Sequence, residues 1–221
     1  LTSAAIAAGI TWTDGSTSEK TLTFTINRES VTIPTVLNAT QTYKGGEYEF
    51  GVSNYDSTKM TVNTSGLTSS VAGTTVTWDS ATEKFKATDA AVYTVKFKLT
   101  SPNYMWSDNT TTDQSKTITI NKKELTFNIS NSTTSASNPT FDFGSAGNIT
   151  VNASASGIST PDFVLNMYYI KDGDTTNPLT TGVDQDARTL DVSEIASSGS
   201  YKLCVELTSA AANKNYSIAN G

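Results

Sequence analysis

The stretch Tyr93-Thr-Val-Lys-Phe-Lys-Leu-Thr-Ser101 decides the fold class of this chain. Its apolar side chains alternate strictly with polar ones, and a period of two is typical of a β-strand with one buried face. The same pattern returns in the same phase at Tyr201-Lys-Leu-Cys-Val-Glu-Leu-Thr-Ser209, and Leu1-Thr-Ser3 matches its end. We therefore expect a repeated unit that is built around this strand.

The composition favours an all-β protein of one large domain or two ordinary ones. The 221 residues include 66 Thr and Ser, and only 16% of the residues are charged. β-Branched residues are frequent, and long stretches with helical spacing of apolar residues are scarce. The regular apolar positions and the low charge argue against disorder.

The charge balance argues against nucleic-acid binding. The net charge is −6, and only Arg28 and Arg188 among the 15 basic residues are arginines. No basic stripe is present to neutralise phosphates. No apolar run is long enough to cross a bilayer, so we expect no membrane contact within this segment. An acidic chain rich in Thr, Ser and Asn is typical of an extracellular or cell-surface protein.

Short matches indicate a duplication, which is the first sign of a repeat protein. Ile26-Asn-Arg28 matches Ile120-Asn-Lys122, and Trp12-Thr-Asp14 matches Trp106-Ser-Asp108, both at an offset of 94. The other matches are Tyr48-Glu-Phe-Gly51 with Phe141-Asp-Phe-Gly144 and Met60-Thr-Val-Asn63 with Ile149-Thr-Val-Asn152.

The matches also predict an insertion in the second repeat. Val62 and Tyr93 are 31 positions apart, whereas Val151 and Tyr201 are 50 apart, which leaves 19 extra residues. We place them in a hairpin over 164–183, because its Asp-Gly turn lies between two extended runs. About seven short strands in each repeat are typical of an antiparallel sandwich.

The run Asp89-Ala-Ala-Val-Tyr-Thr-Val95 resembles the Asp-x-Ala/Gly-x-Tyr-x-Cys run of an immunoglobulin F strand, with Val95 in place of Cys. Ser197-Ser-Gly-Ser-Tyr-Lys-Leu203 resembles it too. The whole chain is similar to the tandem Ig-like repeats of large bacterial surface proteins of the adhesin type. This resemblance implies two tandem sandwiches, tyrosine hydroxyls that bond back to the upstream backbone, and a structural or adhesive role. Glycans or a host surface are then expected partners.

The two ends are out of phase with the repeats. Residues 207–221 align with residues 1–15 without a gap. We therefore predict a terminal strand segment at 1–27 that belongs to a preceding or partner repeat. An Ig-like domain 1 at 28–122 and an Ig-like domain 2 at 123–221, which lacks its last strand, would follow.

Two explanations fit this phase. The chain is a window cut from a longer covalent array, a fragment or a processed product. Alternatively, residues 16–27 of one copy fill domain 2 of the next copy head-to-tail, which would build a filament. In the second case the donated residues are Thr21, Leu22, Phe24 and Ile26.

No catalytic constellation is visible, so we expect a non-enzymatic protein without a cofactor. The chain has no His, the usual base of nucleophilic triads. Calcium is the most plausible metal, with oxygen ligands from Asp172, Asp174 and Asn177, although the same residues also suit a plain hairpin turn. The pair Asp184 and Asp186 is a second candidate of the same kind.

Tyr168 and Tyr169 are candidate ligand contacts, because aromatic rings on a hairpin can stack on sugars. Such a platform would make the chain a carbohydrate-binding module of a secreted enzyme, the alternative to a structural segment. Packing within the core is the competing interpretation of both tyrosines. The single cysteine, Cys204, falls on the polar face of its strand.

Overall fold

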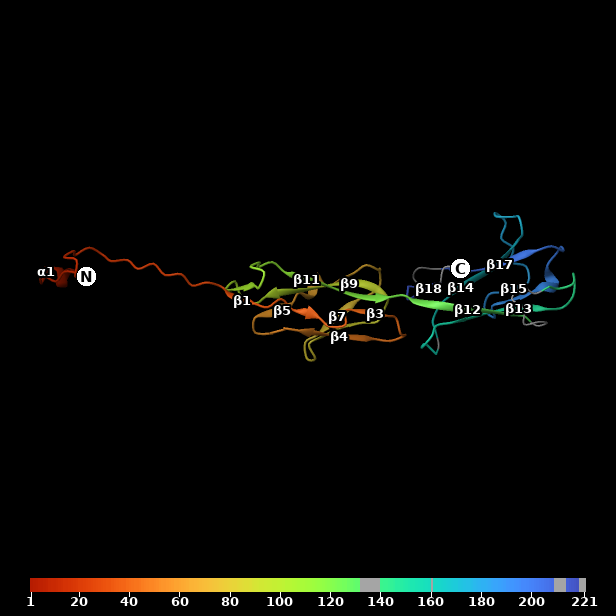
Figure 1. Ribbon diagram of the computed structural model, residues 1–221, viewed down its shortest axis with the longest axis horizontal. Coiled ribbons are helices and arrows are strands. Elements are labelled where there is room, and N and C mark those ends of the chain that lie inside the picture. The colour runs from red at the N-terminus through yellow and green to blue at the C-terminus, as the bar shows by residue number, and fades with distance from the viewer. Residues whose placement is uncertain (132–139, 160, 209–213, 219–221) are drawn as a thin grey trace.

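The computed structural model describes residues 1–131, 140–159, 161–208 and 214–218. It confirms the all-β prediction, because two Ig-like sandwiches follow one another, domain 1 with strands β1 to β11 and domain 2 with strands β12 to β18. Figure 1 shows the domains end to end, with residues 1–27 running away from domain 1 on the side opposite domain 2. The only helix with α geometry in these ranges is α1 (Ser3–Ala7), and no described helix is long and apolar enough to cross a membrane.

Domain 1 consists of β1 (Glu29–Val31), β2 (Thr35–Val36), β3 (Thr40–Thr42), β4 (Tyr48–Ser53), β5 (Met60–Val62), the 3₁₀ turn η1 (Thr64–Gly66), β6 (Thr68–Ser69), β7 (Val76–Asp79), β8 (Lys84–Ala87), β9 (Ala91–Leu99), β10 (Tyr104–Trp106) and β11 (Gln114–Asn121). One sheet has the order β2-β4-β8-β7, and the other has the order β3-β11-β9-β5 with β6 beside β9. These are the A-B-E-D and G-F-C orders of an Ig-like sandwich. In addition, β10 pairs in parallel with β1.

The core of domain 1 follows from the alternation in β9. Tyr93, Val95 and Phe97 are fully buried, and Phe97 packs edge to face against Phe85 of the opposite sheet. Burying each such side chain contributes about 1.5–3 kcal/mol. Strand β11 closes the core, because its residue Ile118 pairs with Tyr93 and is fully buried.

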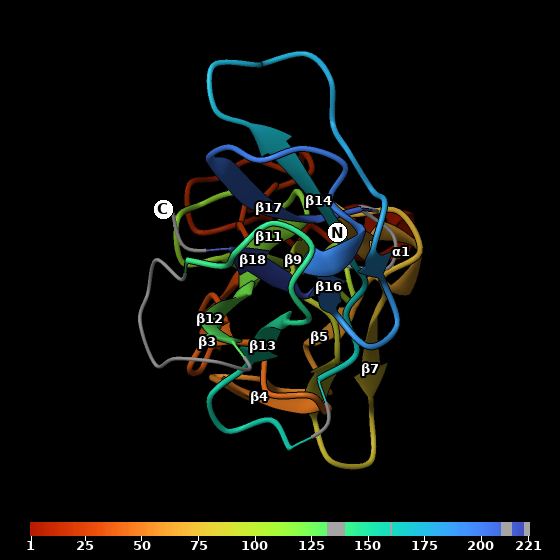
Figure 2. The ribbon, with the colours of Figure 1, turned by 90° about the vertical axis from the view of Figure 1, so that its right-hand side faces the viewer.

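Domain 2 consists of β12 (Lys123–Asn131), β13 (Asn148–Ser154), β14 (Leu165–Lys171), β15 (Val183–Asp184), β16 (Thr189–Asp191), the 3₁₀ turn η2 (Val192–Glu194), β17 (Tyr201–Leu207) and β18 (Tyr216–Ile218). Its larger sheet has the order β15-β16-β13-β12-β18, and β14 and β17 form the second sheet. Figure 2 shows β14 and β17 on one side of the domain and β12 and β13 on the other. Of residues 207–221, which were aligned with 1–15, positions 209–213 and 219–221 lie outside the described residues.

The strand pairings show that two of the sequence matches were wrong. Strand β13 pairs with β12 and β16 just as β4 pairs with β2 and β8. Residues 149–152 therefore correspond to β4, not to Met60–Asn63. Residues 141–144 form no strand, and Phe143 is exposed beside Gly144, whose φ of +75° belongs to a turn.

The predicted insertion was also wrong. Val62 pairs with Phe97 in domain 1, and Met167 pairs with Val205 at the equivalent place in domain 2. The segment from Val62 to the end of β7 at Asp79 is as long as the segment from Met167 to the end of β15 at Asp184. The segment 164–183 is therefore no insertion but the counterpart of β5 to β7.

Both expected tyrosine corners are present. The Tyr93 hydroxyl donates to the carbonyl of Asp89 at 2.7 Å, and the Tyr201 hydroxyl donates to the carbonyl of Ser197 at 2.6 Å. Each bond ties the start of the F strand to the loop that enters it.

Asp89 also anchors the junction between the domains. The Asn215 side chain accepts from the backbone N–H of Ala90 at 2.7 Å and donates to the Asp89 carboxylate at 3.0 Å. Lys214 forms an ion pair with the same carboxylate at 2.9 Å, and the rings of Tyr43 and Tyr216 meet edge to face. The residues just before β18 thus join domain 2 to domain 1 directly.

We expect Tyr93→Phe to lower the free energy of unfolding by about 1–2 kcal/mol, because it removes the bond to Asp89 inside a closed core. Tyr201→Phe is the matched control and should cost less, because Tyr201 is only half-buried. Urea unfolding curves measure both values. An equal or larger cost at Tyr201 would contradict this account of the corners.

Candidate functional site: an open sheet edge and an exposed segment

Strand β17 is the F strand of domain 2, and its two edges differ. One edge pairs with β14 along its whole length, while no strand of the described part of domain 2 pairs with the other. In domain 1 the equivalent edge of β9 pairs with β11. The inward side chains of β17 are only half-buried, whereas their counterparts on β9 are fully buried. An unpaired edge over a partly covered core is a site for strand addition.

A groove of about 680 Å³ runs beside β17, and we call it the open groove. Its lining includes Tyr201 and Leu203 of β17 together with Ile149, Tyr169 and Leu190. The last three are apolar or aromatic and form an apolar part of the lining, and Asp142, Lys202 and several serines also line the groove.

One strand pair that lines the open groove has smaller side chains than its counterpart in domain 1. The pair Ile149 and Leu190 joins β13 to β16, where the pair Phe50 and Phe85 joins β4 to β8. Two aliphatic side chains thus replace two phenyl rings at the centre of the sheet. The buried ring of Tyr169 lines the same groove, so the two domains fill this part of the core with different side chains.

The residues predicted as a donated strand pair with no strand among the residues that the structure describes. Thr21–Ile26 has no assigned secondary structure, and Leu22, Phe24 and Ile26 are 88%, 77% and 86% exposed. At the offset of 94, Phe24 and Ile26 correspond to Ile118 and Ile120 of β11, both of which are buried. Three large apolar side chains on one face of an extended segment are typical of a strand that requires a partner.

Residues 12–20, the N-terminal Trp corner, reproduce residues 106–114, the domain 1 Trp corner. In both, the Trp backbone N–H donates to a carbonyl four residues ahead, and the indole N–H donates to one six residues ahead. The bonds are Trp12 to Ser16 at 2.9 Å and to Ser18 at 2.8 Å, and Trp106 to Thr110 at 2.8 Å and to Thr112 at 2.8 Å.

The aspartates of the two corners play the same part. Asp14 accepts from Ser16 and Lys20, and Asp108 accepts from Thr110 and Gln114. The Lys20 ammonium, followed by Ser16, lowers the pKa of Asp14, and the Thr110 hydroxyl is the main cause of the lowered pKa of Asp108. Local sequence therefore forms this corner with or without a sandwich around it.

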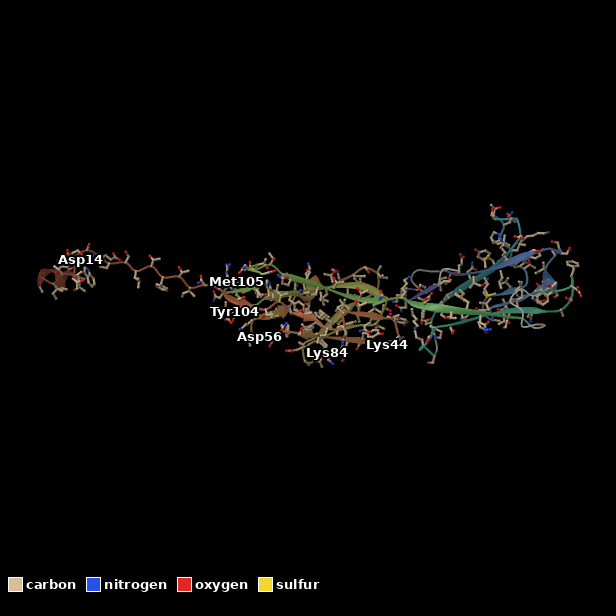
Figure 3. The ribbon with its side chains drawn as sticks, in the orientation of Figure 1. Asp14, Lys44, Asp56, Lys84, Tyr104 and Met105 are labelled. Atoms are coloured by element: carbon tan, nitrogen blue, oxygen red, sulfur yellow. The ribbon has the colours of Figure 1, made fainter. Side chains whose placement is uncertain are left out.

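The surroundings of the two corners differ. Trp106 is fully buried in the core of domain 1, whereas Trp12 is 37% exposed. Figure 3 shows Asp14 out on the N-terminal segment, well away from Tyr104 and Met105 at the near end of domain 1. The exposed Trp12 is therefore a functional candidate that the sequence analysis did not single out, and its match to Trp106 is the signal that could have identified it.

The candidate calcium ligands point to different partners. Asp174 accepts from the backbone of Thr176 and from the Asn177 side chain, whose amide donates at 2.9 Å. Asp172 instead faces Lys202 at 3.2 Å. The first of these arrangements is a turn that its own hydrogen bonds satisfy. In the portion of the chain that the structure describes, no group of three or more acidic, His or Cys side chains is found that could hold a metal ion.

The second acidic pair belongs to a turn that both domains share. Asp184 accepts from the backbone of Asp186 and Ala187, and Asp79 accepts in the same way after β7. The structure thus assigns Asp184 a turn-forming role that domain 1 repeats.

The two candidate tyrosines lie on opposite faces of β14. Tyr169 is 2% exposed and packs edge to face against Tyr201, so its ring belongs to the core of domain 2 and is closed to a sugar. Burial raises the pKa of its hydroxyl. Tyr168 is half-buried opposite Cys204 on the outer face of the β14–β17 sheet.

No protein-family model matches the chain, and no curated protein does. Among solved structures it is similar to tandem Ig repeats of Dlar, with 14% identity over 78% of this chain and 89% of that one, and a TM-score of 0.22. It is also similar to the Yersinia pseudotuberculosis adhesin InvE, with 15% identity, coverage of 82% and 51%, and a TM-score of 0.29. For extracellular domains 3–5 of Drosophila OTK the identity is 12%, the coverage 81% and 57%, and the TM-score 0.25. The chain spans about half the length of the latter two.

We expect Tyr169→Ala to destabilise domain 2 by about 3–5 kcal/mol, because it opens a cavity beside Leu190 and Tyr201. Tyr168→Ala, on the neighbouring and more exposed position, should cost less than about 1 kcal/mol. Thermal unfolding followed by circular dichroism measures the difference. Saturable polysaccharide binding that Tyr169→Ala abolishes without loss of stability would overturn this assignment.

Proposed function

We propose that the chain is a non-catalytic, extracellular structural subunit whose copies join head-to-tail by strand donation. Residues 16–27 of one copy would enter the open groove of the next and complete its domain 2 as a last strand. Donor-strand complementation of this kind obtains affinity from main-chain hydrogen bonds and specificity from alternate side chains in pockets.

The observation that carries the proposal is the fit between the groove and the segment. The register of β11 on β9 sets Ile118 opposite Tyr93. Transferred to domain 2, it sets Phe24 opposite Tyr201, above the place where Ile149 and Leu190 have replaced two phenyl rings. The donated Phe24 is larger than Ile118, and the pair Ile149 and Leu190 is smaller than the pair Phe50 and Phe85, so we expect the two changes to offset each other.

The donor has to come from another copy. Residues 1–27 leave domain 1 at the end opposite domain 2, so domain 1 stands between the segment and the groove of the same chain (Figure 1). A contact of this kind uses two different surfaces and does not close on itself, which builds a filament rather than a ring. Adhesion to glycans or to a host surface would be a property of the assembled filament.

We expect Phe24→Asp to prevent filament formation, because it places a charge in the apolar part of the groove. Thr23→Asp is the matched control, since its counterpart Thr117 points outward on β11, and it should assemble normally. Sedimentation velocity and electron micrographs of the purified full chain report both outcomes. Filaments that form equally well with Phe24→Asp would refute strand donation.

The mass of filaments isolated from their source and then denatured distinguishes strand donation from the competing covalent array. Strand donation predicts that complete unfolding of the filament releases a single short species with only these two domains. A chain of many repeats joined by peptide bonds would keep a much larger mass under the same conditions and would exclude exchange between copies.

A further inference from the structure

We propose that the donor contributes a second element, and that the edge of β12 now held by β18 is the binding site for the N-terminal Trp corner of the incoming copy. This inference rests on the proposed function and extends it. The donated unit is then residues 12–26, and its Trp12 is a second anchor beside Phe24.

The first argument is spacing. Trp12 precedes Phe24 by the same number of residues as Trp106 precedes Ile118. The two corners share their hydrogen bonds, and if Thr21–Phe24 adds to the sheet as β11 does, the separation in space would match as well. When Phe24 takes the place of Ile118, Trp12 takes the place of Trp106.

The second argument is the position that Trp106 holds. In domain 1 it pairs with Val31 at the end of the parallel β10–β1 ladder and is fully buried. In domain 2 the equivalent ladder joins β18 to β12, and Ile218 pairs with Leu125. In the same register, the incoming Trp12 would pair with Leu125 in place of Ile218.

The third argument is that the two ends of β18 are held differently at the edge of β12. Ile218 is half-buried where Trp106 is fully buried. Tyr216, in contrast, is buried against Phe163 and Tyr43, and Asn215 is bonded to domain 1. The exchange thus begins after Tyr216: the acceptor keeps its junction to domain 1, and Trp12 displaces Ile218.

A consequence is that each acceptor carries its own weak competitor. The backbone pairing of Ile218 with Leu125 occupies this edge of β12 in the free subunit, and Trp12 of the incoming copy would replace Ile218 in the same register. Assembly is then a displacement of β18 as well as an addition to β17, which disfavours capture of unrelated strands that lack the corner.

The test uses synthetic peptides as caps on the full chain, added before assembly begins. A peptide of residues 16–27 carries the donor strand alone, and a peptide of residues 10–27 carries the corner too. We expect the longer peptide to halve filament mass, measured by sedimentation, at about a tenfold lower concentration, because it buries an additional indole ring. The longer peptide with Trp12→Ala is the matched control and should lose this advantage.

The acceptor side is tested with Ile218→Ala and Ile218→Trp in the full chain. Ile218→Ala weakens the competing side chain and should increase the advantage of the longer peptide. Ile218→Trp strengthens it and should reduce that advantage. Equal potency of the 10–27 and 16–27 peptides on the unaltered chain would overturn the Trp corner site and leave strand donation intact. If neither peptide caps filaments that form normally, the proposed function itself fails.

Discussion

The pairing of a last strand against the F strand is the interaction on which each sandwich depends. Buried backbone N–H and C=O groups need partners, and the inward side chains of a sheet need a cover. Strand β11 supplies both in domain 1, where Tyr93, Val95 and Phe97 are fully buried. Domain 2 has the same F strand and the same tyrosine corner, but its inward residues on that strand stay half-buried beside the open groove.

The alternation of apolar and polar residues, together with the turn residues between the runs, sufficed to predict the fold. The period of two in Tyr93–Ser101, its return at Tyr201 and the upstream acidic or serine residue identified the F strands and their corners, because these features are local. The place of each strand within the sandwich was harder to predict. A short Thr-Val run such as Ile149–Asn152 suits either sheet of a sandwich, and only the pairings place it opposite β16 instead of β17. Local propensity does not distinguish two sheets that have the same alternation.

The candidate site was predictable in part. Thr21–Ile26 was identified from its match to β11, and its exposed Leu22, Phe24 and Ile26 agree with a strand that has no sheet of its own. The burial of Tyr169 was not predictable, because alternation on β14 could not say which face met the core. The small side chains at Ile149 and Leu190 became informative only once the strand order had placed them opposite each other.

The strand order of domain 1 also decides how the molecule carries load. Strand β3, near the start of the domain, runs parallel to β11, with which the domain ends, and pairs with it over Thr40–Thr42. Tension applied through the two ends pulls these strands in opposite directions along their length. Their hydrogen bonds then bear the force in shear and must break together instead of opening one after another. A rod of such units resists stretching far better than hairpins pulled apart from one end.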